Sequence, residues 1–507
     1  MKKLICLLLC ILMLTSALLV SCAKEDDNQS SAPDTGSSTS VEDVSKENSN
    51  ETSADDRYTD SEGKYVNKNL PPFDSAWLDY GEFRVLVYNK ETQDTYFSEE
   101  IEAPYDTTDA KLKEGVDERN TWIKENYGIT IKAVAVKDVL TTFRQEALSG
   151  TYSFDVAMPF MAAAATLARE GYLYDLREFS DYIDLEAPWW DQNATQSLSI
   201  NNRVFFTTGD ISIMQRIVSG GVAFNRKLVA DYFPDVNMYE LVDSGKWTLD
   251  KFYQMSKTFT RQGDDDEKMD ENDFWGCMGG GIGFYYGAGE SLMAKDENDI
   301  PIIHIGDDER SLTVAQKVLE LLGEKGTWYI TANDFTNQTD KWAKTVEIFG
   351  TDKALFMTFA FSAIKKYRAY DVEFGIVPVP KFNENQDYYY TSCTANMAYG
   401  ICIPTFVEDK DFAAYMVELL AVGGKNYITN SYYNSILKGK DLKLEDDERM
   451  LDLIFSNIIY DVALVYQFAG LNNVFTNANK DNLISHLDTI RSGVLDAIEE
   501  VVDSYRD

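Results

Sequence analysis

The chain has 507 residues, 84 of them acidic and 47 basic, which gives a formal net charge of -37. This charge argues against nucleic acids and anionic lipid surfaces as binding partners, because like charges repel. Apolar residues make up 44% of the chain and aromatic residues 13%, so the length fits two or three domains with sizeable hydrophobic cores.

The N-terminus has the three parts of a secretory signal. Residues 1–3 are basic, residues 4–20 are almost entirely apolar, and small Ser21 precedes Cys22. This ending resembles the bacterial lipobox, which implies cleavage after residue 21 and diacylation of Cys22. Two acyl chains would hold the protein stably on the outer face of the bacterial cell membrane. The alternative is an uncleaved transmembrane anchor, which the acidic residues directly after the apolar run disfavour.

Residues 22–69 are expected to form the lipidated start of the mature chain and a disordered acidic linker. Up to about Asp60 this stretch consists mainly of Ser, Thr, Asn, Asp and Glu. Such a segment buries too little apolar surface to fold. We therefore expect it to act as a spacer between the membrane and a globular part that begins near Leu70.

Strands and helices alternate in the first part of the globular region. Strands are predicted at 82–89, 129–134 and 154–158, and helices at 108–126, 139–148 and 162–170. This order predicts an α/β fold with parallel strands. Farther along, strands are expected at 203–210, 222–225, 354–357 and 374–378, and helices near 248, at 312–324, 412–421, 446–459 and 483–502.

Residues after strand ends are the first candidates for a binding site, because ligands of open α/β sheets lie beyond the carboxyl ends of strands. This rule selects Tyr88, Asn89, Phe160, Met161 and Asp210.

A sugar needs aromatic faces for its C–H surface and polar side chains for its hydroxyls. Trp189, Trp190 and Asp191 offer both within three residues. The alternative is that both tryptophans only pack the protein interior.

Several stretches, in this order, resemble the extracellular solute-binding proteins of ABC importers, in the sugar-binding type-1 group. They include DERNTWIKENYGITI, YSFDVAMPF, LAREGYLYDL, APWWDQ, FFTTGDIS, VAFNRKLV, GKWTLDKF, FGTDKALF and FGIVPVPKFNENQDYYY, spread over residues 80 to 470. The resemblance implies the type II fold of periplasmic binding proteins, in which two α/β lobes joined by a hinge enclose the ligand in a cleft.

By this resemblance, lobe 1 comprises residues 70–207 and 353–405, and lobe 2 comprises residues 208–352 and 406–507. The chain would cross between the lobes near 206–210, 349–352 and 403–405. Gly209 and Gly350 are the expected hinge residues, because glycine tolerates changes of backbone conformation.

The same resemblance places Phe284, Tyr285 and Tyr286 on the cleft rim of lobe 2, after the glycine-rich loop 279–283. The alternative is an aromatic core beneath a glycine turn. Phe361 and Tyr433 are further candidates for ligand contact.

Relatives often carry an EF-hand-like calcium loop where this chain has an acidic run. The resemblance implies a structural calcium ion with the ligands Asp264, Asp266, Lys268 (through its carbonyl), Asp270 and Asp273. The sequence departs from the loop pattern, since Gln262 replaces the first acid and Glu267 replaces the turn glycine. The alternative is a solvated acidic turn.

Catalysis has little support in the sequence. The two histidines, His304 and His486, are far apart, and neither a Gly-x-Ser-x-Gly nor a His-Glu-x-x-His motif occurs. Cys277, Cys393 and Cys402 have no disulfide or zinc spacing, so we interpret them as buried apolar residues.

We therefore expect a monomeric receptor that requires no cofactor. It would capture a carbohydrate, a sugar or an oligosaccharide, and pass it to an ABC permease. A surface glycoside hydrolase and a carbohydrate-binding adhesin are the alternatives.

Overall fold

The computed structural model describes residues 56–91, 95–104, 107, 109–264, 268–335, 340–367, 369–438 and 445–506. The predicted signal segment, Cys22 and the linker up to residue 55 lie outside the described residues. None of the helices in the described part of the chain is both long and apolar enough to cross a membrane.

The first sheet has three parallel strands in the order β2-β1-β3. Its strands are β1 (Glu82–Tyr88), β2 (Thr130–Val136) and β3 (Val156–Ala157). The helices that alternate with them, and the two that follow, are α2 (Ala110–Tyr127), α3 (Val139–Ser149), α4 (Met161–Arg169), η2 (Leu176–Phe179) and α5 (Gln192–Leu198). The predicted alternation is thus confirmed.

Local capping explains where these helices begin and end. The Asp138 side chain accepts a hydrogen bond from the backbone N–H of Thr141 at the start of α3. Gly150 ends the same helix in the left-handed conformation, at φ 67°.

The second sheet has five strands in the order β10-β4-β9-β5-β8. Strand β4 is antiparallel to both β9 and β10, whereas β5 is parallel to both β9 and β8. The strands are β4 (Gly220–Asn225), β5 (Trp275–Met278), β8 (Tyr329–Ile330), β9 (Ala354–Ala360) and β10 (Phe374–Val377).

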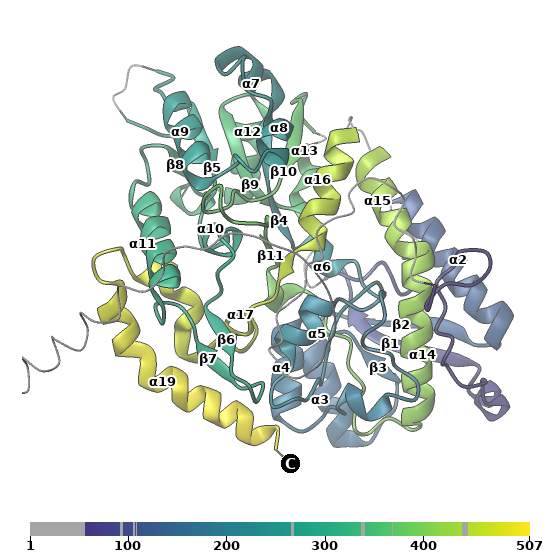
Figure 1. Cartoon of the computed structure of the whole chain (residues 1–507). Coiled ribbons are helices and arrows are strands. Elements are labelled where there is room, and N and C mark those ends of the chain that lie inside the picture. The colour runs from purple at the N-terminus through teal and green to yellow at the C-terminus, as the bar shows by residue number, and fades with distance from the viewer. Residues whose placement is uncertain are drawn as a thin grey trace, which may run out of the picture. The chain divides into compact units, whose positions relative to one another are not determined.

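Helices surround this second sheet in the upper half of Figure 1. They are α7 (Arg226–Tyr232), α8 (Met238–Asp243), α9 (Leu249–Phe259), α10 (Gly283–Gly287), α11 (Glu309–Gly323), η3 (Ala332–Asp334), α12 (Lys341–Gly350), η4 (Phe361–Ala363), α13 (Ile364–Tyr367) and α16 (Glu445–Ser456). Buried Asp447 of α16 fixes that helix to β10, since its Oδ1 accepts from the backbone N–H of Ile376 at 3.2 Å.

The sheet membership differs from the predicted lobe boundaries. Strands β9 and β10, within the stretch 353–405 assigned to lobe 1, pair with β4 in the second sheet. Conversely, α14 (Lys410–Gly423), the π-helical turn η6 (Gly424–Ile428) and α15 (Thr429–Lys438) pack against α2 beside the first sheet (Figure 1). Both sheets belong to one unit, residues 54–507.

The start of the described chain is folded onto this unit. Thr59 and Tyr65 form a β-bridge, and Tyr65 exchanges two hydrogen bonds of 2.9 Å with the side chain of Asn426. The short helix η1 (Ser75–Tyr80) follows. Residues 56–69, predicted as part of the disordered linker, therefore contain ordered structure, because the Tyr65 backbone finds a partner far along the chain.

The remaining elements lie outside the two larger sheets. They are α6 (Met214–Ile217), the hairpin β6 (Met293–Lys295) and β7 (Pro301–Ile303), the pair β11 (Thr391–Ser392) and β12 (Ile458–Ile459), η5 (Ala395–Met397), α17 (Val462–Tyr466), η7 (Phe468–Asn473), α18 (Val474–Asn477) and α19 (Leu483–Ser504). The tip of the hairpin docks beyond the end of α5, where Lys295 and Asp299 both bond Ser199.

Candidate functional site

The segment Gly209–Asp210 leads from the first sheet toward the second and is tightly enclosed. Gly209 forms a β-bridge with Trp190, and the N–H of Asp210 donates to the carbonyl of Trp189 at 2.8 Å. A side chain on Gly209 would overlap that carbonyl, and one on Gly424 would overlap the carbonyl of Asp210. The glycines thus permit close approach of backbones.

The expected hinge glycines therefore have another role in the structure. Gly209 is needed for contact with Trp189, and Gly350 ends α12 against the ring of Tyr370, which a side chain would overlap. Neither has the positive φ at which glycine is required for conformational reasons.

Asp210 is the centre of a buried charged network. Its Oδ1 accepts from Arg216 Nη2 at 2.7 Å and from Thr429 Oγ1 at 2.6 Å, and its Oδ2 lies 3.3 Å from Lys425 Nζ. Burial alone would raise the pKa of Asp210, but the Arg216 and Lys425 charges hold it below its ordinary value. The carboxylate is therefore ionised and its charge is compensated.

A cavity of about 250 Å³ borders this network. Its lining comes from the segment before α5, from the crossing segment and α6, from η6, and from the end of α16, which packs on the second sheet. The cavity thus lies between elements of both sheets. The lining residues are Pro188, Trp189, Trp190, Asp191, Gln192, Asn193, Gly209, Asp210, Gln215, Arg216, Lys425, Phe455 and Ser456.

Four of the sequence-predicted residues, Trp189, Trp190, Asp191 and Asp210, border this cavity, but the tryptophan side chains are buried. Trp189 is 0% exposed and Trp190 3%, and each indole N–H donates to Glu418 at 3.1 Å. Both tryptophan side chains therefore pack in the protein interior, as the alternative interpretation of the sequence states. Asp191 caps α5 and accepts from the Tyr460 hydroxyl at 2.7 Å, and burial raises its pKa.

Phe455 provides an aromatic face at the cavity that the sequence reasoning missed. Its ring lies 4.7 Å from that of Phe361 and 5.7 Å from that of Tyr433, both predicted candidates. Burial raises the pKa of Tyr433 to about 12, although the nearby Arg216 charge opposes this shift. Phe361 and Tyr433 thus contact Phe455, which lines the cavity, but do not line it themselves.

A second aromatic cluster follows the ends of β1 and β3. Tyr88 stacks on Phe160, with 4.1 Å between ring centroids, and Tyr399, which sequence reasoning missed, packs against both. The two predicted site residues next to them in sequence, Asn89 and Met161, are not part of this aromatic cluster. Asn89 accepts from the N–H of Glu91 in a turn, and Met161 is fully buried. Tyr88 and Phe160 therefore contact each other, and none of Tyr88, Asn89, Phe160 and Met161 lines the cavity.

Phe284, Tyr285 and Tyr286 lie in the interior instead of on a cleft rim. All three are at most 2% exposed, and the Tyr285 hydroxyl shares a 2.9 Å hydrogen bond with Ser311 of α11. Gly279, Gly280 and Gly281 before them adopt positive φ, from 102° to 143°. The alternative of an aromatic core beneath a glycine turn is therefore the one observed.

The acidic run 264–273 is only partly described, because Asp266 lies outside the described residues. Asp273 is fully buried, and its two carboxylate oxygens accept from the N–H groups of Gly263 and Asp270 at 2.6 Å. Among the described residues, no cluster of His, Cys, Asp or Glu has the arrangement of a metal site. The calcium site remains a prediction.

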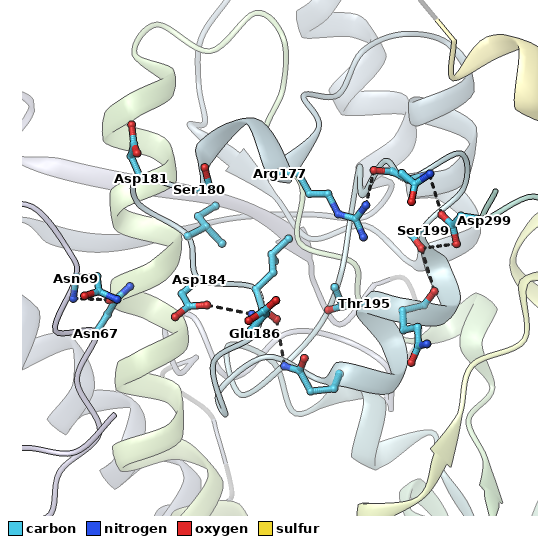
Figure 2. A pocket seen from close by; sticks show the side chains of 15 residues that line it. Asn67, Asn69, Arg177, Ser180, Asp181, Asp184, Glu186, Thr195, Ser199 and Asp299 are labelled. Carbon is cyan, nitrogen blue, oxygen red and sulfur yellow. Dashed lines mark hydrogen bonds between the residues drawn. The ribbon is translucent and has the colours of Figure 1, made fainter. Parts of the chain in front are cut away.

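A larger basin of about 890 Å³, lined mainly by residues between 177 and 202, is shown in Figure 2. Its polar groups largely bond each other, as when Arg177 donates to the carbonyl of Asn202 and Ser199 to Asp299. None of the described residues that line it is aromatic. The smaller cavity, which has both an aromatic face and buried charged groups, is therefore the better candidate site.

The three remaining cysteines agree with their interpretation from the sequence. Cys277, Cys393 and Cys402 are free and buried, and burial raises the pKa of each thiol. None of them is placed for redox or nucleophilic chemistry.

Comparison with protein families decides the class of the protein. A family described as bacterial extracellular solute-binding protein matches residues 103–422. The chain belongs to this family. Solute-binding proteins of this kind are extracellular and bind their solutes without catalysis, so the predicted absence of enzymatic function follows from family membership. The comparison with curated proteins found no match.

Solved structures show that the fold is that of the family. A cyclo/maltodextrin-binding protein complexed with maltotetraose is 12% identical, with a TM-score of 0.50 over 84% of this chain and 97% of that chain. A sugar transporter from Rhizobium etli in an open conformation is 13% identical, with a TM-score of 0.50 over 83% and 98%. The predicted α/β fold of periplasmic binding proteins is thus confirmed for this solute-binding protein.

Proposed function

We propose that this solute-binding protein is a lipid-anchored, monomeric receptor that captures a sugar or an oligosaccharide outside the cell and delivers it to the permease of an ABC importer. The observation that carries the proposal is the cavity between elements of both sheets. There the Asp210 network provides polar contacts and Phe455 an aromatic face. Sugars are bound by this combination of groups.

The fold neighbours support the choice of a sugar over other small solutes. One of them was solved with maltotetraose, and another is described as a sugar transporter. The charges at the cavity also favour a sugar, because the Asp210 carboxylate is already paired with Arg216 and Lys425. An amino acid or a polyamine would need a charged partner that is free.

A thermal-shift screen tests the solute class. The chain with Cys22→Ser would be screened against neutral sugars, acidic sugars, amino acids and polyamines, since a ligand that binds only the folded state raises the melting temperature. We expect a sugar to raise it. If an amino acid or a polyamine does so and no sugar does, the proposed solute class is wrong.

Lipid anchoring rests on the N-terminal sequence, with an apolar run that ends at Ser21 and Cys22. In a bacterial host grown with a labelled fatty acid, we expect the chain to carry the label and to sediment with membranes. The Cys22→Ser variant should lose both properties. An unlabelled but membrane-bound chain would indicate an uncleaved apolar anchor instead.

A further inference from the structure

Residues 58–66, near the start of the described chain, form a small hairpin, the N-terminal hairpin. The N–H of Asp60 donates to the carbonyl of Lys64 at 2.9 Å, and the N–H of Val66 donates to the carbonyl of Tyr58 at 2.8 Å. The hairpin is therefore an ordered element with its own backbone hydrogen bonds, which can hold other parts of the protein in place.

This hairpin contacts two of the segments that line the cavity. The ring of Tyr58 packs edge-on against Trp189, with 5.4 Å between ring centroids. The backbone of Tyr65 exchanges two hydrogen bonds with the Asn426 side chain. The Lys425 ammonium lies 5.4 Å from the centre of the Tyr65 ring, within the range of a cation–π contact. Trp189 and Lys425 line the cavity, whereas no residue of the hairpin does, so the hairpin supports the lining from behind.

Lys425 belongs to η6, a single π-helical turn between α14 and α15. Such turns are rare, and those that occur are frequently found at functional sites. On one side, η6 packs so closely against α2 that a side chain on Gly115 would overlap the carbonyl of Tyr427. On the other side, Lys64 Nζ of the hairpin donates to the Tyr427 hydroxyl at 3.4 Å. The turn is thus fixed by α2 and by the N-terminal hairpin.

The Lys425 ammonium is the member of the Asp210 network that a ligand can reach best. Its side chain is 25% exposed, compared with 14% for Arg216 and 4% for Asp210. An ammonium group has three N–H donors, so it can donate to a hydroxyl group and still remain beside Asp210. A lysine side chain is flexible, and its position therefore depends on the groups that hold it, which here are Asp210 and the Tyr65 ring.

We propose that the N-terminal hairpin is a positioning element of the binding site, in which Tyr65 and its partner Asn426 hold the Lys425 ammonium where it contacts a hydroxyl group of the bound sugar. This inference rests on the proposed function. It makes the affinity for the sugar depend on residues outside the cavity, in a stretch that the sequence assigns to the linker.

Calorimetric titration of the full chain carrying Cys22→Ser tests the inference. The probes are maltotetraose, cellotetraose and each neutral sugar that raises the melting temperature in the thermal-shift screen. Lys425→Met should weaken binding about tenfold, which is the effect of one lost hydrogen bond. Tyr65→Leu removes the cation–π contact, and Asn426→Ala releases the hairpin from η6. Each should weaken binding about fivefold.

A double-mutant cycle distinguishes positioning from a merely structural role. In the Lys425→Met background, Tyr65→Leu and Asn426→Ala should change the affinity less than twofold, because the group that they position is no longer present. A merely structural role of the hairpin would instead give the same loss of affinity in both backgrounds, and this result would overturn the inference.

Two exposed residues provide matched controls. Asn430 follows η6 on α15, and Tyr152 is 48% exposed in the loop after α3. Asn430→Ala and Tyr152→Leu should leave the affinity unchanged. Thermal melts verify that all variants fold, and if Asn426→Ala does not fold, Tyr65→Leu and its cycle with Lys425→Met still decide.

The outcomes separate this inference from the proposed function. Binding of a sugar that neither Tyr65→Leu nor Asn426→Ala weakens would overturn the role of the hairpin and leave the receptor function intact. Failure of every probe to bind the chain with an unaltered hairpin would overturn the proposed function itself, and this inference with it.

Discussion

The side-chain amide of Asn67 donates a 2.7 Å hydrogen bond to Oε1 of Glu418, a residue of α14 that is fully buried. The same carboxyl group accepts from the indoles of Trp189 and Trp190. Asn67, which the sequence assigns to the disordered linker, thus contacts a buried acidic group near the segment Gly209–Asp210. The folded body therefore begins before residue 67, within the stretch 22–69 that was predicted as a disordered linker.

Asn67→Ala should lower the free energy of unfolding by about 2 kcal/mol, because it removes a hydrogen bond to a buried carboxyl group. The matched control is Asn69→Ala, since Asn69 is exposed. Chemical denaturation measures both. If the two variants are equally stable, the contact between the N-terminal segment and Glu418 does not hold the segment in place.

Glu418 should make stability depend on pH. Burial raises its pKa from 4.5 to about 8, although hydrogen bonds from Asn67, Trp190 and Trp189 oppose the shift. Between these two values the folded state binds a proton that the unfolded state has lost. The free energy of unfolding should therefore fall as the pH rises from 4.5 to 8. Glu418→Gln cannot titrate, so its stability should fall less over this range.

Denaturation curves of the wild type and Glu418→Gln at several pH values test this prediction. Other buried carboxyl groups, such as Asp461 with its pKa raised to about 6, are common to both proteins and cancel in the difference. An identical pH dependence of the two proteins would mean that Glu418 is ionised throughout.

Asp210→Asn should destabilise the protein by about 3 kcal/mol, because it leaves Arg216 and Lys425 beside a buried group without a charge. The control is Asp243→Asn, whose ion pair with Arg449 is exposed on both sides and should contribute less than about 1 kcal/mol. Urea titrations at neutral pH measure both. Equal, small effects would show that the Asp210 network is not buried in solution.

Lys295 should hold the hairpin β6-β7 against the end of α5. Its ammonium bonds Ser199 and Asp299, with only 18% of the side chain exposed. Lys295→Met should lower the free energy of unfolding by about 2 kcal/mol. Lys227 forms the same i,i+4 pair with Asp231 on α7, but at 60% exposure, so Lys227→Met should have almost no effect. Comparable losses would contradict the role of the hairpin.

Much of the fold could be predicted because its signals are local. Asp138 before α3 and Gly150 after it mark the ends of that helix, and the apolar strands on either side fix the α/β order. Helix caps and strand composition act within a few residues, so sequence reading finds them. Membership in the family followed from the order of such segments.

The errors concern contacts between distant residues. The pairing of β9 and β10 with β4 joins stretches more than 100 residues apart, and nothing in strand composition selects the partner. The burial of the Trp189 and Trp190 indoles could not be foreseen, because their partner, Glu418, lies in α14, far along the chain. Phe455 was missed for the same reason, since only tertiary packing brings it to the cavity.

The most direct test of the account is a crystal structure of the protein grown with whichever sugar raises its melting temperature. We predict electron density for the sugar in the cavity bounded by Asp210, Arg216 and Phe455. Density in the larger basin beside Arg177, or between Tyr88 and Tyr399 with the cavity vacant, would contradict it.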